Sequence, residues 1–374
     1  MAFTLHVDSV KFRSHLRDVH AELAHVSAHL TPVIKGNGYG FGRDLLAKEA
    51  ALLNVTKICV GTVWEVESVA PHFPNLIHVL EPFNPRDAVS VGKWRHVVSQ
   101  FGDRVVATVT DTDVSLLSQV GIRHIIIEGL TSLHRFGLTP DQITHLMRNL
   151  PADLTLHGFN LHLAIASPQK SDLPVQPSST SSSSSVKVQE IVGWIDYLQQ
   201  HATNSDTPIS ISVSHLEVAE ISSLSNQIRN VTLDARVGTG LWLGAKGALK
   251  VTGTVLAVHD VSTTTGVGYT QTRGGRRLIV VSGGTSHGVA LAAPVTRSSL
   301  RKRAIAIAEG FSQAVGKVRS PFIHSGRNLH FAEPPHMHVS LLWSDDKDIC
   351  VGDELLCTVR NTTTQFDVVL GLQN

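Results

Sequence analysis

The sequence has almost no net charge and only three cysteines among its 374 residues, and each scarcity excludes a class of function. A formal net charge of +1 gives no electrostatic case for a nucleic-acid partner or an anionic membrane surface. Cys59, Cys350 and Cys357 are odd in number and lack metal-like spacing, which indicates a reducing compartment without a disulfide framework. We therefore expect a small-molecule partner.

Long apolar runs are also missing from the sequence. No apolar stretch approaches the ~20 residues that span a bilayer, and the N-terminal MAFTLHVDSVKFRSHL carries charges where a signal peptide needs an apolar core. These features predict a cytoplasmic protein with no membrane partner. A chain of this length exceeds one small core, so it indicates two domains or one large barrel with an appendage.

Short β-branched runs alternate with helical patterns up to about residue 245. The helical patterns cover 12–30, 43–53, 114–120, 139–149 and 190–201, and the runs are TPVIK, KICVGTV, LIHVLEP, RVVATVT, HIIIEG, HGFNLHLA, ISISVSH and ARVGTGLW. Roughly eight strand–helix units of this kind predict a (β/α)8 TIM barrel over residues 1–245, with its chemistry at the carboxyl ends of the strands. A doubly wound sheet is the alternative.

Two other segments differ from this alternation. Residues 168–187 (PQKSDLPVQPSSTSSSSSVK) have too few apolar side chains to pack, which predicts a flexible surface loop after the sixth strand. Residues 246–374 show strand-length alternation broken by glycine and threonine turns. We expect them to form a separate, mostly antiparallel β domain.

The segment PVIKGNGYGFG (32–42) ends an apolar run with Lys35 and then has glycine at every second position. The spacing is not GxGxxG and no Gly-Lys-Ser/Thr follows, which excludes dinucleotide and P-loop sites. Such a turn lets the backbone pass close to a bound group at the mouth of a barrel. A partly desolvated lysine there has a lowered pKa and can form a Schiff base with a carbonyl compound; an ordinary solvated lysine is the alternative.

This segment resembles the signature of alanine racemases and their relatives, the fold-type III pyridoxal-phosphate enzymes, in which that lysine carries the cofactor. Other pieces are similar to the same family in the same order: HVDSVKFRSHLRDVHAEL, KICVGTVWEVESV, LTSLHRFGL, GFNLHLAIA, ARVGTGLWLG, GVGYTQT and VGDEL. Together they span most of the chain. The sequence is therefore identified as a member of this family with a divergent C-terminal domain.

The resemblance implies pyridoxal 5′-phosphate as cofactor and two acid/base groups. Lys35 holds the cofactor and is one base, while Tyr269 is the other and comes from the partner subunit of a homodimer. Tyr39 also falls on a family position and is expected at the cofactor. Arg236 faces the pyridine nitrogen and does not protonate it, because arginine is no proton donor near neutral pH. The cofactor is then a weak electron sink, which favours racemisation over transamination.

Further cofactor contacts are implied at the ends of later strands. Gly238 and Thr239 offer backbone N–H groups to the phosphate, as bare backbone anion sites do. Ser214 or His215 helps to hold the phosphate, with a structural role as the alternative for both. His162 lies beside the cofactor ring or is an ordinary buried histidine.

The resemblance places Arg135 and Met337 at the substrate, with the N–H of Met337 near the substrate carboxylate. Glu128 stands where many racemases carry a carbamylated lysine. Both groups are anionic, so Glu128 could pair with Arg135 without the modification, unless it simply ends a strand at the surface.

The C-terminal part departs from the family on the substrate side. Thr285 replaces an entrance tyrosine, and His287 replaces an aspartate. His336 and His338 stand where racemases have cysteine and aspartate, and no tyrosine follows Tyr269 to help bind the phosphate. The substrate is therefore not assumed to be alanine.

The histidines of HFAEPPHMH need their own interpretation. His336 and His338 are two residues apart, so in a strand they would share one face and could bind zinc. The segment is also similar to the Pro-x-His-x-Cys metal site of D-serine dehydratases and D-threonine aldolases, except that His338 replaces the cysteine. We expect no metal, and histidines that line an altered substrate pocket.

The function expected from these observations is a pyridoxal-phosphate-dependent amino-acid racemase. It would act on a small-molecule amino acid by two-base removal and return of the Cα proton. Two alternatives remain: a metal-assisted lyase or dehydratase acting on a D-hydroxyamino acid, and a non-catalytic pyridoxal-phosphate-binding protein.

Overall fold

The structure is a computed structural model that describes residues 2–177, 184–201, 208–274, 277–291 and 318–372. It divides into two compact units. The barrel unit consists of Arg13–Gly38 and Arg43–Gly244, and the sheet unit consists of Met1–Phe12, Tyr39–Gly42 and Ala245–Asn374. Each unit is described by itself below.

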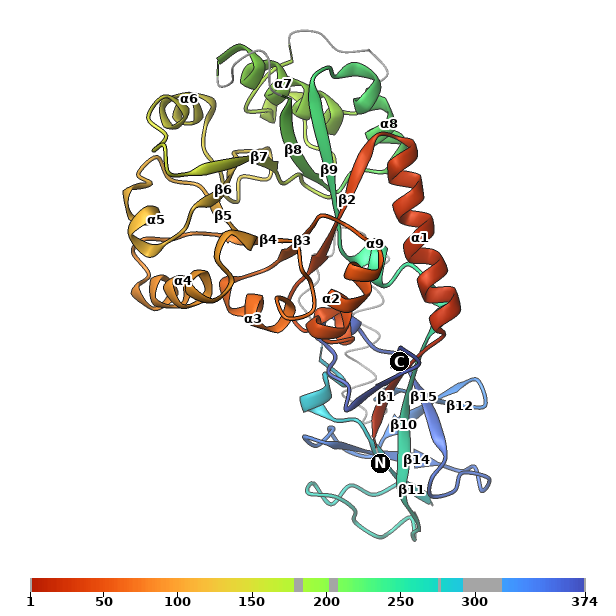
Figure 1. Cartoon of the computed structure of the whole chain (residues 1–374). Coiled ribbons are helices and arrows are strands. Elements are labelled where there is room, and N and C mark those ends of the chain that lie inside the picture. Colours follow the sequence, from red (N-terminus) through yellow and green to blue (C-terminus); the bar gives the residue numbers. More distant parts are fainter. Residues whose placement is uncertain (1, 178–183, 202–207, 275–276, 292–317, 373–374) are drawn as a thin grey trace. The chain divides into compact units, whose positions relative to one another are not determined.

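The barrel unit is built on eight parallel strands that pair in chain order and close into a barrel (Figure 1). Pairing of the first strand with the last, as in Thr31 opposite Arg236, completes the ring. The strands are β2 (Ala28–Ile34), β3 (Lys57–Val60), β4 (Leu76–Pro82), β5 (Val105–Val109), β6 (His124–Gly129), β7 (Thr155–Leu161), β8 (Ile209–Ser214) and β9 (Val231–Val237). The predicted (β/α)8 barrel is confirmed.

The helices of this unit alternate with the strands along the chain, beginning with a helix before β2 (Figure 1). They are α1 (Ser9–His25), α2 (Arg43–Leu52), α3 (Val66–Val69), α4 (Ala88–Phe101), α5 (Ser115–Val120), α6 (Pro140–Arg148), α7 (Val186–His201), α8 (Val218–Gln227) and α9 (Thr239–Trp242). The helix predicted over 12–30 is wrong at both ends. It starts earlier, and it stops before Ser27, whose φ of 58° no helix accepts.

Polar side chains meet inside the barrel. Lys57 Nζ lies 2.7 Å from Asp234 Oδ2 although β2 separates their strands, and both side chains are 9% exposed. A second contact joins His78 Nε2 on β4 to the Thr108 hydroxyl on β5 at 2.8 Å. Buried charges are tolerated only when paired, so these contacts constrain which strand faces which.

The sheet unit contains an eight-stranded sheet in the order β11-β14-β13-β12-β15-β10-β1-β16. Because β11 also pairs with β10, six of the strands form a closed ring. All neighbours pair antiparallel except β1 with β16. The strands are β1 (Phe3–Val7), β10 (Leu249–Asp260), β11 (Arg277–Ser282), β12 (Arg319–His324), β13 (Arg327–Phe331), β14 (Val339–Ser344), β15 (Glu354–Cys357) and β16 (Val368–Leu370).

The assignment of residues 1–245 to one domain differs from the structure at the chain start. β1 pairs with β10, Phe3 opposite Gly253, and thus belongs to the sheet unit. Phe3 is fully buried there and packs on Phe322 and Phe366 with ring centroids 6.4 and 5.5 Å apart. The antiparallel character expected for residues 246–374 is confirmed for the described strands.

The segment 168–187 is not the featureless loop that its composition predicts. Leu173 is buried at 7% exposure, Ser184 is buried as well, and α7 already begins at Val186. Residues 178–183, the serine-rich part, lie outside the described residues.

None of the described helices combines the length and the apolar character that crossing a bilayer requires.

Glycine substitutions provide a test of the barrel geometry. Gly158 interrupts the register of β6 and β7 with a φ of +127°, and a Cβ there would lie 2.3 Å from the Ser210 carbonyl oxygen. Gly158→Ala should therefore destabilise the protein by about 1–3 kcal/mol from backbone strain alone, with the clash in addition. Gly92→Ala in α4 meets nothing within 4 Å and should stabilise by about 0.5–1 kcal/mol. Urea unfolding measures both, and equal effects would contradict the strained conformation.

Candidate active site at the mouth of the barrel

Lys35 stands at the carboxyl end of β2, where the glycine turn begins. Gly36 and Gly38 both have a φ of 62°, and Tyr39 has a φ of 55°. The turn is left-handed at these positions, a conformation that glycine adopts without strain. This explains the repeated glycines behind the lysine.

A carboxylate holds this turn against the neighbouring strand. Glu65 is nearly buried, and its two oxygens accept the backbone N–H groups of Gly36 at 2.8 Å and Gly61 at 2.6 Å. A Cβ on Gly61 would lie 3.1 Å from the Cβ of Lys35. Arg43 donates from its guanidinium to the Gly36 carbonyl oxygen. The backbone of Gly36, directly after the lysine, is thus held by the side chains of Glu65 and Arg43.

Sequence reasoning missed Glu65 as a site residue. It is thirty residues from Lys35 in sequence, and a single acidic residue in a helical pattern is ordinarily a solvated one. Its only signal was its place in KICVGTVWEVESV, the segment similar to the family's second strand unit.

The Lys35 amine is in an environment that disfavours its charge. Burial lowers its pKa first, followed by the guanidinium groups of Arg135 and Arg236, while the Glu65 carboxylate opposes them. A lowered pKa leaves a larger fraction of the amine neutral, and the neutral amine is the nucleophile. The neutral Lys35 amine can therefore attack a carbonyl compound.

Arg236 lies on β9 inside the barrel mouth and is 7% exposed. Its Nη2 donates to the Leu161 carbonyl oxygen at 3.2 Å. Its Nε, however, is buried without a hydrogen-bond partner among the described residues. A buried donor without an acceptor is costly, so this atom marks a place where a ligand with an acceptor would be stabilised.

His162, Ser214 and His215 lie together at the ends of β7 and β8. The Ser214 hydroxyl is 2.9 Å from His162 Nδ1, and the two imidazole rings have centroids 5.1 Å apart. Burial and the Arg236 guanidinium lower the pKa of His162 to about 2, so it is neutral. His215 Nδ1 lies 3.0 Å from the Leu163 carbonyl oxygen and must be its donor.

The carboxyl ends of β8 and β9 border a cavity of about 220 Å³. Ser214, His215 and Arg236 line it together with residues of α1 and α8. Gly238 and Thr239 follow β9 directly, at the first turn of α9. Three of the positions that were expected near the cofactor, Ser214, His215 and Arg236, therefore border one cavity of the barrel unit, and Gly238 and Thr239 follow Arg236 closely along the chain.

The expected pairing of Glu128 with Arg135 is not among the ion pairs of the described residues. Glu128 is 2% exposed and accepts a hydrogen bond from Asn160 Nδ2 at 2.9 Å. Burial raises its pKa, against the pull of Arg236, Asn160 and Arg135. Arg135 is exposed, and its guanidinium lies 5.1 Å from the centre of the Phe136 ring. Glu128 is thus a buried interior carboxyl group, and the surface alternative for it is wrong.

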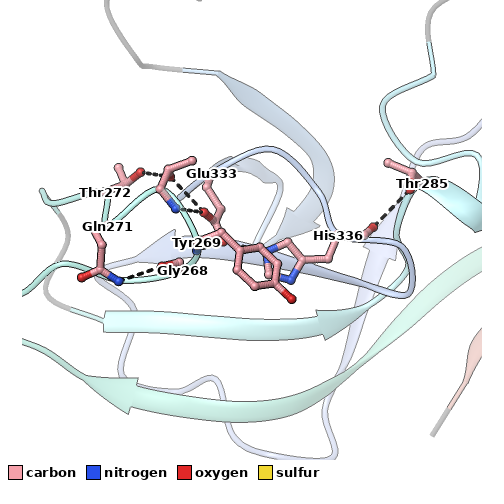
Figure 2. A network of polar contacts seen from close by, with 8 residues as sticks. Gly268, Tyr269, Gln271, Thr272, Thr285, Glu333 and His336 are labelled. Atoms are coloured by element: carbon pink, nitrogen blue, oxygen red, sulfur yellow. Dashed lines mark hydrogen bonds and ion pairs between the residues drawn. The ribbon is translucent and has the colours of Figure 1, made fainter.

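The sheet unit carries the other predicted residues, and the expectation about the two histidines needs correction. Tyr269 is not on a strand but in a turn between β10 and β11, where it is 86% exposed (Figure 2). His336 and His338 precede β14 and do not share a strand face. Instead, His336 Nε2 lies 2.6 Å from Glu333, and His338 Nδ1 lies 3.1 Å from the Ser286 hydroxyl. The reason is the Pro-Pro pair before them, which cannot join a central strand.

Met337 and Tyr39 also belong to the sheet unit. Met337 is 67% exposed, and its carbonyl oxygen accepts the Ser286 N–H at 3.0 Å. Tyr39 is 4% exposed. Thr285 hydrogen-bonds the His336 carbonyl, and His287 Nε2 lies 3.3 Å from Asp367. Within the described ranges, no three His, Cys, Asp or Glu side chains are grouped to hold a metal ion.

The fold and the site together define a (β/α)8-barrel protein with a lysine of lowered pKa at the carboxyl end of its first strand. The chain belongs to the alanine racemase family, because the model of the alanine racemase N-terminal domain matches residues 7–229. The predicted family membership is therefore confirmed. No curated protein is significantly similar to this chain in sequence.

Solved structures support the fold over nearly the whole chain. Alanine racemase from Bartonella henselae, with covalently bound pyridoxal phosphate, is 16% identical at a TM-score of 0.64, over 96% of this chain and 90% of that one. Alanine racemase from Clostridium difficile is 15% identical at 0.66, over 95% and 86%. The biosynthetic alanine racemase from Pseudomonas aeruginosa is 18% identical at 0.60, over 96% and 91%. Identities this low establish the fold alone.

The environment of Lys35 can be tested through its chemical reactivity. Arg135→Gln removes one positive neighbour, so the pKa of the Lys35 amine should rise and its reductive methylation should slow near neutral pH. Peptide mapping by mass spectrometry over a pH series measures this rate. Arg123→Gln is the matched control, because Arg123 pairs with Asp153 on the surface. A rate profile shifted to lower pH in Arg135→Gln would contradict the electrostatic account.

Proposed function

We propose that this protein is a pyridoxal-phosphate-dependent amino-acid racemase of the alanine racemase type. The observation that carries the proposal is the Lys35 amine itself. It ends the first barrel strand on a turn held by Glu65, and burial and two guanidinium groups lower its pKa. Such an amine is suited to hold an aldehyde cofactor.

The residues around Lys35 fit this cofactor. The Arg236 Nε is a buried donor without a partner among the described residues, and the pyridine nitrogen is an acceptor. Ser214, His215, Gly238 and Thr239 at the ends of β8 and β9 would hold the phosphate. His162, neutral and buried, would lie against the ring. When bound, pyridoxal phosphate supplies an electron sink that acidifies the Cα–H bond of an amino acid.

The nature of Arg236 favours racemisation over other reactions. A guanidinium stays protonated near neutral pH and gives up no proton to a pyridine nitrogen. Arg236 would therefore leave the ring nitrogen neutral, and a neutral ring would stabilise negative charge at Cα only weakly. A proton would therefore return rapidly to Cα. Racemisation requires a proton donor on each of the two faces of Cα.

Lys35 and Tyr269 are the two proposed proton carriers. Lys35 would serve one face of Cα, and Tyr269 would serve the other. We propose a homodimer in which Tyr269 reaches the site of the partner subunit, with Tyr39 near the cofactor. The exposure of Tyr269, 86%, supports a role toward a group outside its own turn.

Substrate binding is assigned to Arg135 and to the N–H of Met337. The altered His336 and His338 would line the substrate pocket, so the amino acid need not be alanine. The metal-assisted lyase stays the alternative; in the structure His336 hydrogen-bonds Glu333, and His338 hydrogen-bonds Ser286. The three free cysteines support action in a reducing compartment, the cytoplasm.

Isotope exchange tests the proposed reaction. The protein with its cofactor is incubated with a panel of amino acids in deuterium oxide, and deuterium at Cα and enantiomer composition are measured. Lys35→Ala should abolish both, and Tyr269→Phe should lower exchange on one face by about 10²–10⁴-fold.

Several outcomes would contradict the racemase. No Cα exchange with any amino acid would exclude it, and pyruvate or glycine release that requires added zinc would identify the metal-assisted lyase instead. Borohydride treatment should fix a pyridoxyl group on Lys35. A Tyr269→Phe variant without any altered property would indicate a non-catalytic binder.

A further inference from the structure

Glu333 accepts hydrogen bonds from four donors on one buried carboxylate. Its Oε1 accepts the Tyr269 N–H at 3.1 Å and His336 Nε2–H at 2.6 Å. Its Oε2 accepts both the N–H and the hydroxyl of Thr270 at 2.9 Å. The residue is 5% exposed. Burial raises its pKa, but the hydrogen bonds outweigh burial and the net pKa is lowered, so the carboxylate stays charged.

The turn that carries Tyr269 is shaped around this carboxylate. Gly268 has a φ of +70°, and a Cβ there would lie 2.0 Å from Glu333 Oε1. The turn closes by reciprocal backbone hydrogen bonds of 3.0 Å between Val267 and Thr272. Figure 2 shows Tyr269 and Glu333 meeting at this turn. Position 268 therefore requires glycine for two reasons: its φ is positive, and a Cβ would collide with the Glu333 carboxylate.

The core of the sheet unit anchors both partners of this contact. Val267, which precedes Gly268, and Ala332, which precedes Glu333, belong to one buried cluster with Leu278 and Leu341. The two chain segments are more than sixty residues apart in sequence but start from the same packed base. Only a few residues then separate the anchored backbone from the tyrosine ring, which limits its freedom.

The same carboxylate also orients an aromatic neighbour of Tyr269. Because His336 Nε2–H donates to Glu333, the rotation of the imidazole is fixed. Its ring packs on the Tyr269 ring with centroids 4.4 Å apart and planes inclined at 33° (Figure 2). One anion therefore controls the phenol twice, through its backbone and through the ring that packs on it.

We propose that Glu333 is a positioning residue that orients Tyr269 for proton transfer at Cα. The proposal rests on the proposed racemase function, in which Tyr269 serves one face of the substrate. Glu333 itself touches neither substrate nor cofactor in this scheme. It acts by holding the turn at residues 268–272 and the His336 imidazole, so its effect is confined to the face that Tyr269 serves.

The geometry can be tested without cofactor. The chain has only three tyrosines, so protein labelled with ¹³C-tyrosine should give three sets of ring signals, and Tyr269→Phe identifies one of them. A ring packed at this distance shifts the Tyr269 signals by its ring current. Glu333→Gln places an amide against four donors and should move these signals toward those of a free tyrosine, with the other two unchanged. His336→Ala should do the same.

The catalytic consequence is measured as Cα exchange in deuterium oxide from each enantiomer separately. Glu333→Gln should lower exchange on the face served by Tyr269 by on the order of 10²-fold, the cost of a small misplacement, and leave exchange on the Lys35 face unchanged. Glu333→Asp should recover part of the loss. Glu354→Gln is the matched control, because Glu354 is an exposed carboxylate of the same unit whose Oε1 lies 3.6 Å from His6.

The outcomes separate this inference from the proposed function. If the unsubstituted protein exchanges no Cα proton, the racemase assignment fails, and the NMR experiment still decides whether Glu333 holds Tyr269. If Glu333→Gln lowers exchange equally on both faces, or leaves the Tyr269 signals in place, the positioning role is wrong. Should Glu333→Gln fail to fold, Glu333→Asp decides, since the shortened carboxylate must lower exchange only on the face that Tyr269 serves.

Discussion

The candidate site depends on the Glu65 carboxylate, which accepts hydrogen bonds from two backbone N–H groups, those of Gly36 and Gly61. Through it the end of β2 and the start of the loop after β3 are held at one point, and Lys35 is carried on that point. A lysine side chain has four rotatable bonds and loses much entropy when ordered, so its backbone must be held by other groups. The pKa of the Lys35 amine is lowered because the amine is held close to Arg135 and Arg236. The Arg236 Nε, which has no hydrogen-bond partner among the described residues, belongs to the same site.

The two units share one arrangement at the turns that carry the proposed proton carriers. In each, a nearly buried glutamate accepts backbone N–H groups of a glycine turn, Glu65 in the barrel unit and Glu333 in the sheet unit. In each, the residue proposed to move a proton sits in that turn. A charge-assisted hydrogen bond to backbone is shorter and stronger than a neutral one, and it leaves the functional side chain unencumbered.

The barrel was predictable because its strands are buried on both faces and read as unbroken β-branched runs, as in HIIIEG and KICVGTV. Lys35, Arg236 and His162 were chosen as candidates from family motifs that local sequence carries, and their roles stay predictions. Glu65 and Glu333 were not, because each acts on a turn far away in the chain and no local pattern records a long-range partner. The strand expected at His336 failed where Pro334 and Pro335 remove the backbone donors that pairing needs.

The place of β1 in the second sheet has a consequence for how the molecule can be assembled. β1 lies between β10 and β16, whose residues are separated from it by more than two hundred positions. During synthesis the earliest-made strand must wait unpaired while all eight barrel strands emerge, whereas the barrel needs only contiguous chain. The sheet is thus a late, high-contact-order event. If the chain were cut near residue 245 and the two parts expressed separately, β1 would be on the barrel fragment. β10 would then lack the strand with which it pairs.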